Sequence, residues 1–195
     1  DLTLGAARPV VLQGDAGLSQ KSTEPGNASF YYSMPRLATS GTVTIDGQAH
    51  AVTGLSWLDR EWSTSALGAD QAGWDWFALQ LADGRDLMYY RLRRKDGAVD
   101  GMSRGSLVDA AGRRTELGAD LPLHPLRWWS APDGRRFPVE WELRLPHEAG
   151  PLRVVAVFDD QYMKLAVRYW EGMVDVRDGV TGEPLGRGYL EMTGY

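Results

Sequence analysis

The sequence predicts an all-β protein in which most of the chain forms a closed antiparallel barrel of about eight strands. Short stretches that alternate apolar and polar residues recur along the chain, and turn signals such as Asp-Gly separate them. No stretch has the apolar spacing of an amphipathic helix, and only residues 160–166 favour a short helical turn. About eight strands follow residue 70, which is enough to close a barrel that holds one small ligand or fills with side chains.

The first part of the chain predicts short, irregularly spaced strands. Pro35 ends one of them, because proline has no N–H to donate to a strand ladder. Asp46-Gly47 is the strongest hairpin signal in the chain. The predicted elements are, in order, a strand at Val10–Gln13, a loop over 14–27, a strand at Ala28–Met34, a hairpin of Gly41–Ile45 and His50–Thr53, an extended stretch at Leu55–Ser63 and a connection over 64–72.

From Gly73 onward the predicted strands become regular. Trp74–Ala82 carries large apolar groups on both faces, which indicates a strand between a barrel interior and a second packed surface. Val139–Leu145 instead alternates cleanly between apolar and charged residues. The predicted strands are Trp74–Ala82, Asp86–Arg93, Ser103–Asp109, Arg114–Leu117, Leu126–Ser130, Val139–Leu145, Leu152–Phe158, Val167–Arg177 and Leu185–Thr193.

Composition excludes several classes of function. Hydrophobic residues make up 43% and charged residues 24% of the chain, as in soluble globular proteins. The net charge of −5 and the scattered basic residues argue against a nucleic-acid partner, and no apolar run is long enough to span a membrane. With no cysteine, thiol catalysis and disulfides are excluded. The chain opens on Asp1 without a leader segment, so we expect a mature form or a fragment.

Three segments mix aromatic and acidic residues more densely than a plain core requires. In residues 57–62, period two places Trp57, Asp59 and Glu61 on one face. The second segment is Gly73–Trp76, and the third is Arg168–Gly172. These segments supply the candidate site residues.

Several ordered motifs together resemble the AttH and carotenoid 1,2-hydratase family of bacterial lipocalin-like proteins. The matching runs cover nearly the whole chain and are Tyr31–Leu37, Gly54–Trp62, Gly73–Trp76, Tyr169–Gly172 and Gly186–Tyr195. The resemblance implies two tandem lipocalin-like barrels related to the allene oxide cyclase barrel. Residues 67–195 would then be the C-terminal barrel. Residues 1–66 would be the closing strands of a first, incomplete barrel plus a connection, and the missing N-terminal barrel of the same protein would be a partner.

The resemblance also implies an activity class. Family members include hydratases of acyclic carotenoids, more distant relatives are polyketide and terpenoid cyclases, and others are described only as secreted hydrolases. Asp59, Glu61 and Trp62 match the family motif, whereas Arg60 stands where the carotenoid hydratases carry a histidine. An arginine stays protonated at neutral pH and cannot donate a proton, which argues against carotenoid hydration itself. A secreted or periplasmic location follows from the resemblance alone.

Acid chemistry on an alkene fits these residues. A buried carboxylic acid has a raised pKa and can deliver a proton, and aromatic faces stabilise the resulting carbocation by about 0.5–2 kcal/mol each. Such chemistry requires no metal or cofactor. We expect Asp75 to be the acid, with Asp59 second and Glu61 beside it. The expected ligand-binding residues are Trp57, Trp62, Trp74, Trp76, Tyr90, Tyr169 and Trp170.

Structural explanations for the same residues remain open. Asp59, Arg60 and Glu61 also fit an ion-pair cluster, and Asp75 also fits a carboxylate that accepts backbone N–H bonds at a barrel rim. For Glu171 and Glu191, the sequence favours salt bridges with Arg187 or Arg168. The three histidines, His50, His124 and His147, lie on different segments and form no metal motif.

The leading hypothesis is a cofactor-independent lyase or isomerase, of hydratase or cyclase type, for a hydrophobic unsaturated terpenoid- or polyketide-like molecule. The alternative is a non-catalytic lipocalin-like carrier of a lipid. In either case the partner is an apolar small molecule. A protonated acid that faces the cavity would favour the enzyme. Carboxylates that are all exposed or paired with arginine would favour the carrier.

Overall fold

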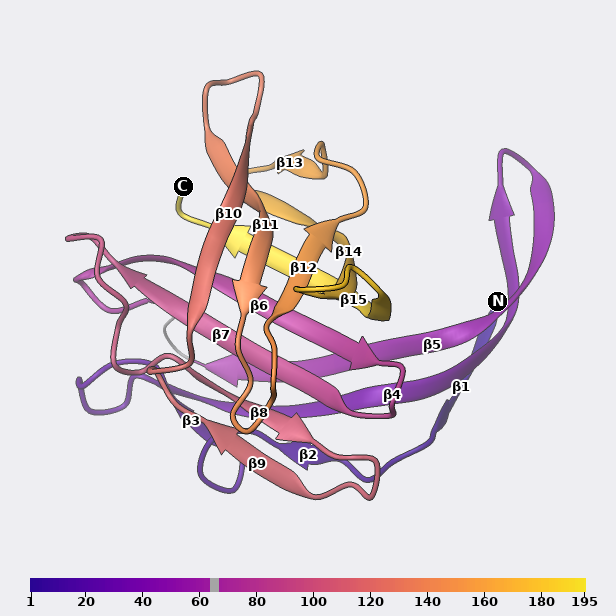
Figure 1. Cartoon of the computed structure of the whole chain (residues 1–195), viewed down its shortest axis with the longest axis horizontal. Coiled ribbons are helices and arrows are strands. Elements are labelled where there is room, and N and C mark those ends of the chain that lie inside the picture. The colour runs from indigo at the N-terminus through magenta and orange to yellow at the C-terminus, as the bar shows by residue number, and fades with distance from the viewer. Residues whose placement is uncertain (64–66) are drawn as a thin grey trace.

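The computed structural model describes residues 1–63 and 67–195, and this part of the chain contains β-strands but no helix. The prediction of an all-β fold is therefore confirmed. The strands form two antiparallel sheets, one of five strands and one of ten, both of which curl (Figure 1). No helix among the described residues is long and apolar enough to cross a bilayer.

The first sheet is built around one long hairpin. Strands β4 and β5 pair along nearly their whole length, from Ser29 opposite Ser63 at one end to Ile45 opposite Gln48 at the turn. The turn end of this hairpin projects away from the rest of the molecule (Figure 1). β1, β2 and β3 pair in turn with the other edge of β4. The strands are β1 (Leu2–Ala6), β2 (Val11–Leu12), β3 (Leu18–Gln20), β4 (Ala28–Ile45) and β5 (Gln48–Ser63).

Pro35 does not end a strand, so that prediction is wrong. β4 continues through it because the register shifts between Met34 and Leu37, which leaves residues 35 and 36 opposite Trp57. A proline is tolerated at such a bulge since no ladder N–H is needed there. The predicted turn at Asp46-Gly47 is confirmed, and both residues have positive φ angles, of 50° and 81°, as a tight hairpin turn requires.

The second sheet has ten strands, and its main path runs in the order β10-β11-β12-β14-β15-β6-β7-β8-β9, with β13 paired to β14. β10, β11 and β12 cross the direction of β6 and β7 (Figure 1). The strands are β6 (Gln71–Leu81), β7 (Asp86–Arg94), β8 (Arg104–Val108), β9 (Arg114–Leu117), β10 (Leu123–Ser130), β11 (Arg136–Leu143), β12 (Leu152–Ala156), β13 (Tyr162–Lys164), β14 (Arg168–Asp178) and β15 (Pro184–Thr193).

The regular strands predicted after residue 73 are present, but the closed eight-stranded barrel is not confirmed. Across residues 1–63 and 67–195, no ladder joins β9 to β10 at the two edges of the sheet. The turn expected over 160–166 instead contains the short strand β13. The connection predicted over 64–72 falls partly on residues 64–66, which lie outside the described residues, and β6 already begins at Gln71.

β6 separates two packed layers, as its pattern predicts. Phe77, Leu79 and Leu81 lie in the main core with Trp141 and Trp170. The even-numbered residues of β6 instead face the first sheet, where Trp76 and Gln80 bond to residues of β4. A second, smaller cluster of Tyr31, Met88, Tyr90 and Leu92 lies at this junction.

Buried polar groups fix the first sheet against the second. Asp86, on β7, is fully buried and forms ion pairs with Arg8 at 2.6 Å and Arg36 at 2.7 Å, both from the first part of the chain. Gln13 donates to Ser33 and accepts from Ser106 of β8. Because these groups must all be satisfied at once, they hold the two sheets in one relative position.

Candidate functional site

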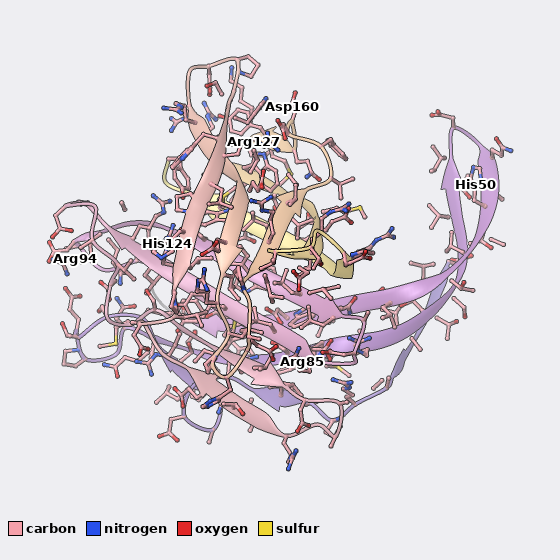
Figure 2. The ribbon with its side chains drawn as sticks, in the orientation of Figure 1. His50, Arg85, Arg94, His124, Arg127 and Asp160 are labelled. Atoms are coloured by element: carbon pink, nitrogen blue, oxygen red, sulfur yellow. The ribbon has the colours of Figure 1, made fainter. Side chains whose placement is uncertain are left out.

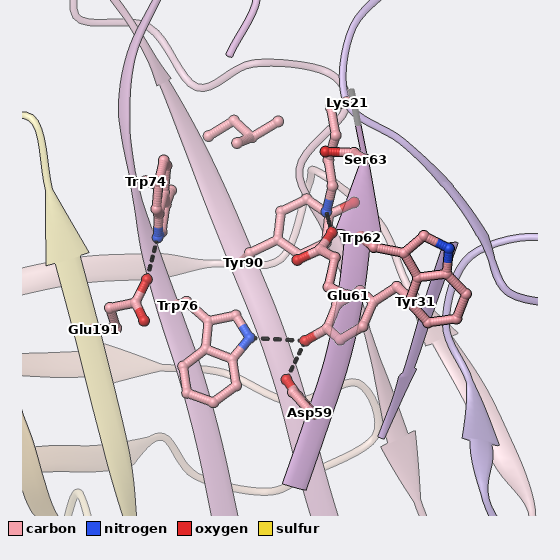
Figure 3. A pocket seen from close by; sticks show the side chains of 11 residues that line it. Lys21, Tyr31, Asp59, Glu61, Trp62, Ser63, Trp74, Trp76, Tyr90 and Glu191 are labelled. Carbon is pink, nitrogen blue, oxygen red and sulfur yellow. Dashed lines mark hydrogen bonds and ion pairs between the residues drawn. The ribbon is translucent and has the colours of Figure 1, made fainter. Parts of the chain in front are cut away.

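A cavity of about 370 Å³ lies where the two sheets meet (Figure 3). Its volume is within the range of small-molecule sites in proteins. Aromatic side chains and three carboxylates form most of its wall, together with one lysine. The lining residues are Lys21, Tyr31, Asp59, Glu61, Trp62, Ser63, Trp74, Trp76, Tyr90, Leu92 and Glu191.

The first sheet supplies one wall of the cavity. Tyr31 of β4 pairs with Glu61 of β5, and Ser33 pairs with Asp59, so these side chains share the face that meets the second sheet. The alternation predicted for residues 57–62 is therefore what brings Asp59 and Glu61 into the cavity together. Lys21, which follows β3, reaches the same wall.

Tyr31 and Asp59 form a buried hydrogen-bonded pair. The Tyr31 hydroxyl donates to Asp59 Oδ2, and Trp57 Nε1 donates to Asp59 Oδ1 at 2.7 Å. Trp76 Nε1 donates to Tyr31 Oη at 3.0 Å, which links this pair to the second sheet (Figure 3). The Tyr31 hydroxyl thus gives one hydrogen bond and accepts another inside the cavity wall.

Burial makes the Asp59 carboxyl easier to protonate. It raises the pKa of Asp59 above its usual value of 3.8, although hydrogen bonds from Ser33, Tyr31 and Trp57 partly oppose the shift. Burial also raises the pKa of Tyr31 well above 10.0, and the neighbouring Asp59 charge adds to this rise. A proton shared by these two groups is therefore held in the cavity wall at a higher pH than in water.

Glu61 is in a different environment. Its carboxylate forms an ion pair with Lys21 Nζ at 2.7 Å and accepts a hydrogen bond from Ser29. The same ammonium group lies over the Tyr90 ring at 4.0 Å and the Tyr31 ring at 5.3 Å. The Lys21 ammonium therefore compensates the negative charge of this carboxylate within the cavity wall.

The second sheet supplies the opposite wall. Trp74 and Trp76 come from β6, Tyr90 and Leu92 from β7, and Glu191 from β15. Trp74 Nε1 donates to Glu191 Oε1 at 2.6 Å (Figure 3). Burial raises the pKa of Glu191 above 4.5, the Trp74 hydrogen bond opposes this, and nearby carboxylates including Glu171 add to the rise.

Asp75, which the sequence analysis predicts to be the catalytic acid, lies on the other face of β6. Its side chain is 0% exposed and pairs with Arg91 at 2.8 Å and with Arg93 at 3.4 Å. Tyr195 Oη also donates to it at 2.7 Å. The structure therefore does not bring Asp75 into the cavity; the carboxylate ties β6 to β7 and to the end of the chain.

Four of the seven predicted ligand-binding aromatics line the cavity, namely Trp62, Trp74, Trp76 and Tyr90. Trp62 does so at the rim, because its ring packs with Phe30 and Tyr32 on the opposite face of the first sheet. The other three do not. Trp57 bonds to Asp59 from beside the cavity, and Tyr169 packs behind Trp74 with ring centroids 6.2 Å apart. Trp170 lies in the main core and donates to the Asp159 carbonyl at 2.7 Å.

Five residues line the cavity but are not among the predicted site residues, namely Lys21, Tyr31, Ser63, Leu92 and Glu191. Tyr31 belongs to one of the recognised motifs, and its spacing in β4 could have placed it. Glu191 was expected in a salt bridge with Arg168 or Arg187, but within residues 1–63 and 67–195 it forms no ion pair and bonds to Trp74. Lys21 lies in an irregular segment where no periodicity indicates its direction.

The histidines do not come together as a metal site in the described part of the chain. Figure 2 shows His50 near the tip of the β4–β5 hairpin and His124 on β10, in well-separated parts of the molecule. In the described part of the chain, no group of three or more His, Cys, Asp or Glu residues is arranged to hold a metal ion.

A family model described as AttH-like matches residues 1–195. A crystal structure assigned to AttH from Nitrosomonas europaea has 36% sequence identity and a TM-score of 0.90, and the match covers 100% of this chain and 60% of that one. Kievitone hydratase from Nectria haematococca has 20% identity and a TM-score of 0.77, and the match covers 99% of this chain and 60% of that one.

The second likeness, at 20% identity, shows a shared fold alone. The chain spans about 60% of the length of each of these two solved structures. No curated protein matches it.

Proposed function

Because the chain belongs to the AttH-like family, we propose that it is a hydratase-type or cyclase-type enzyme for a hydrophobic unsaturated small molecule, terpenoid- or polyketide-like in character. The reaction is acid catalysis within the cavity between the sheets and uses no cofactor. A hydratase with the same fold supports this class of activity. The observation that carries the proposal is the buried Tyr31–Asp59 pair in an aromatic-lined cavity.

The Tyr31–Asp59 pair is the proton donor in this proposal. When Asp59 is protonated, its proton occupies the hydrogen bond to Tyr31, so the Tyr31 hydroxyl is free to point its own proton into the cavity. Transfer of that proton to an alkene carbon leaves a carbocation, and Asp59 returns its proton to Tyr31. Water adds to the cation in hydration, and a second alkene adds in cyclisation. In either case the adduct loses a proton to the Asp59 carboxylate, which restores the donor pair.

The aromatic residues have two roles in the proposal. Trp74, Trp76 and Tyr90 supply apolar area for the substrate and ring faces that stabilise a cation by about 0.5–2 kcal/mol each. Trp57 positions Asp59 through its indole N–H. Asp75 has no role in the chemistry, because it lies on the far face of β6 with two arginines.

A non-catalytic carrier of a lipid is the second candidate. It is favoured by the ion pairs of Asp75 and Glu61, which occupy two of the three carboxylates predicted to be catalytic. The two candidates differ in Asp59, whose hydrogen-bond donors are all uncharged. A carrier needs an apolar cavity but no group that can give up a proton.

We also propose that the first sheet belongs to a first lipocalin-like barrel whose other strands lie outside residues 1–195. One face of this sheet, here called the outer face, exposes Leu12, Leu18, Phe30, Leu58 and Trp62. Leu18, Phe30 and Trp62 are directly paired across three strands, so they form one continuous apolar strip. The rest of that barrel would cover this strip.

The experiment that tests the activity uses isotope uptake. The protein is incubated in D₂O with a panel of acyclic isoprenoids and polyketide-derived phenols, and products are analysed by mass spectrometry. The proposal expects deuterium on carbon in at least one compound with the wild-type protein and none with Asp59→Asn. Binding of a panel member without any label in the wild type would overturn the enzyme and leave the carrier.

A further inference from the structure

We propose that the cavity between the sheets is selective for charge, and that it binds an organic cation with an apolar body in preference to neutral or anionic molecules of the same size. The inference rests on the proposed function for the location of the site and deepens it by naming the charge that the site stabilises. Four observations on the cavity carry it: its charge balance, the partners of its carboxylates, its aromatic faces and its size.

The first observation is the balance of charge. Among the described residues, the cavity is lined by the acids Asp59, Glu61 and Glu191 and by one cationic side chain, that of Lys21. Lys21 lies 2.7 Å from Glu61, so these two charges compensate each other. Asp59, on the first sheet, and Glu191, on the second, remain on opposite walls.

The second observation is that Asp59 and Glu191 have only uncharged donors. Tyr31 and Trp57 donate to Asp59, and Trp74 donates to Glu191. In residues 1–63 and 67–195, neither carboxylate forms an ion pair with an arginine or a lysine. Neutral donors satisfy the lone pairs of an ionised carboxylate without compensating its charge, so a cation that enters the space between the walls stabilises the ionised form of both groups.

The third observation is that the walls already hold a cation. The Lys21 ammonium lies 4.0 Å from the centroid of the Tyr90 ring and 5.3 Å from that of Tyr31. Ring faces attract cations through their quadrupoles, and tryptophan does so most strongly. Trp74 and Trp76 line the same cavity and extend this environment beyond the reach of the lysine.

The fourth observation is the size of the space. A volume of about 370 Å³ accommodates a small tertiary amine with an apolar tail but leaves little room for a large hydration shell. A tertiary ammonium ion has a single N–H group and therefore loses little hydration on entry. Attraction by the carboxylates and the ring faces can then outweigh the free-energy cost of its desolvation. In turnover, the corresponding cation is the carbocation of the proposed reaction.

Burial raises the pKa values of Asp59 and Glu191, and repulsion by Glu61 adds to the rise at Asp59 and repulsion by Glu171 to the rise at Glu191. A cation placed between the two carboxyls opposes both shifts. The groups that face this space are Lys21, Tyr31, Asp59 and Glu61 on the first wall and Tyr90 and Glu191 on the second, with Glu171 beside Glu191. Cation binding is therefore expected to release protons to solvent in the pH range where these carboxyls are partly protonated.

The test compares three probes by isothermal titration calorimetry near neutral pH: N,N-dimethyloctylamine, its neutral analogue N,N-dimethyloctanamide, and octanoate. The wild-type chain is expected to bind the amine at least about tenfold more tightly than the amide, and octanoate more weakly still. Binding on apolar surface elsewhere would not discriminate between the amine and the amide. Equal affinities, or tighter binding of octanoate, would overturn the proposal.

Variants locate the effect in the cavity. Glu191→Gln and Asp59→Asn are each expected to reduce the ratio of amine to amide affinity several-fold, whereas Glu183→Gln, an exposed residue just before β15, leaves it unchanged. A ratio unaffected by both cavity variants would also overturn the proposal. If either variant fails to fold, the other and the wild-type ranking still decide.

The outcome is separable from that of the isotope experiment. Charge selectivity without deuterium uptake would leave this inference intact and remove the proposed enzyme. Deuterium uptake without charge selectivity would remove this inference and leave the enzyme.

Discussion

Four carboxyl groups near the junction of the sheets differ in the partners that they meet. Asp75 lies between two arginines, and Glu61 lies beside Lys21. Within residues 1–63 and 67–195, the hydrogen-bond donors to Asp59 and Glu191 are neutral. Because burial destabilises the charged form, the pKa values of Asp59 and Glu191 are raised, and both groups hold a proton more readily than in water.

Replacing Tyr31 by phenylalanine tests the proton-donor pair. Tyr31→Phe removes a donor to Asp59 and leaves Trp76 Nε1 without its acceptor, so we expect a loss of about 1–3 kcal/mol of stability together with loss of any turnover. Urea denaturation measures the stability change. Tyr32→Phe, on the neighbouring residue of the same strand, is the control and should change stability by less than about 0.5 kcal/mol. Equal effects of the two substitutions would argue against the pair.

The raised pKa of Asp59 predicts how stability depends on pH. In the window between 3.8 and the higher folded-state pKa, the folded protein holds a proton that the unfolded chain has released. The contribution of Asp59 is therefore complete below pH 3.8 and is lost as the pH rises through the folded-state pKa. Asn does not titrate, so wild type should lose stability relative to Asp59→Asn as the pH rises from acid to neutral. A constant difference, measured by urea denaturation across this range, would contradict the shift.

Strand alternation accounts for the part of the site that the sequence could predict. It placed Asp59 and Glu61 on one face, and it indicated that β6 packs on both sides. Alternation does not indicate which face of β6 meets the first sheet, and the prediction of Asp75 as the proton donor therefore placed it on the wrong face. The direction of Lys21 depends on tertiary contacts of an irregular segment, to which no local pattern applies.

At the scale of elements, β6 carries a different polar group on each face. Trp76 on one face bonds to Tyr31 of the first sheet, while Asp75 on the other bonds to Arg91, Arg93 and Tyr195. One strand thus connects the cavity to the core of the second sheet. Any change at Asp75 is expected to act through folding stability and not through the reaction.

Asp75→Asn is therefore expected to destabilise the protein by roughly 3–5 kcal/mol, because it removes a fully buried anion from two partly buried arginine side chains. Thermal unfolding measures the effect. The control is Asp83→Asn, which breaks an exposed ion pair with Arg85 and should cost no more than about 1 kcal/mol. Full stability with loss of turnover in Asp75→Asn would instead give Asp75 a direct role.

At the scale of the whole molecule, the fold class could be predicted more fully than the way the sheets close. Alternation and turn residues such as Asp46-Gly47 are local signals, and they gave the strands. Whether β9 and β10 meet depends on the curl accumulated over ten strands, which no local pattern records. The passage of β4 through Pro35 depends likewise on a bulge set by its partner strand.

The exposed apolar strip on the outer face of the first sheet predicts that residues 1–195 self-associate when no further strands cover it. Phe30 is 57% exposed and Trp62 is 51% exposed, and such continuous apolar strips favour association. Sedimentation velocity should show a sedimentation coefficient that rises with concentration, and Phe30→Ser should weaken this dependence. Val180→Ser, at an isolated exposed residue, should not. A chain that stays monomeric at all concentrations would contradict the proposed need for covering strands.

The most direct test of the central claim, a protonatable carboxyl in the aromatic cavity, is a ¹³C NMR titration of the aspartate side chains with Asp59 assigned by the signal missing in Asp59→Asn. The account predicts that Asp59 titrates clearly above 3.8 and that Tyr31→Phe moves its pKa higher, because a hydrogen bond to the charged form is lost. Titration of Asp59 at or below 3.8 would contradict the account, since no proton would then be available for the proposed chemistry.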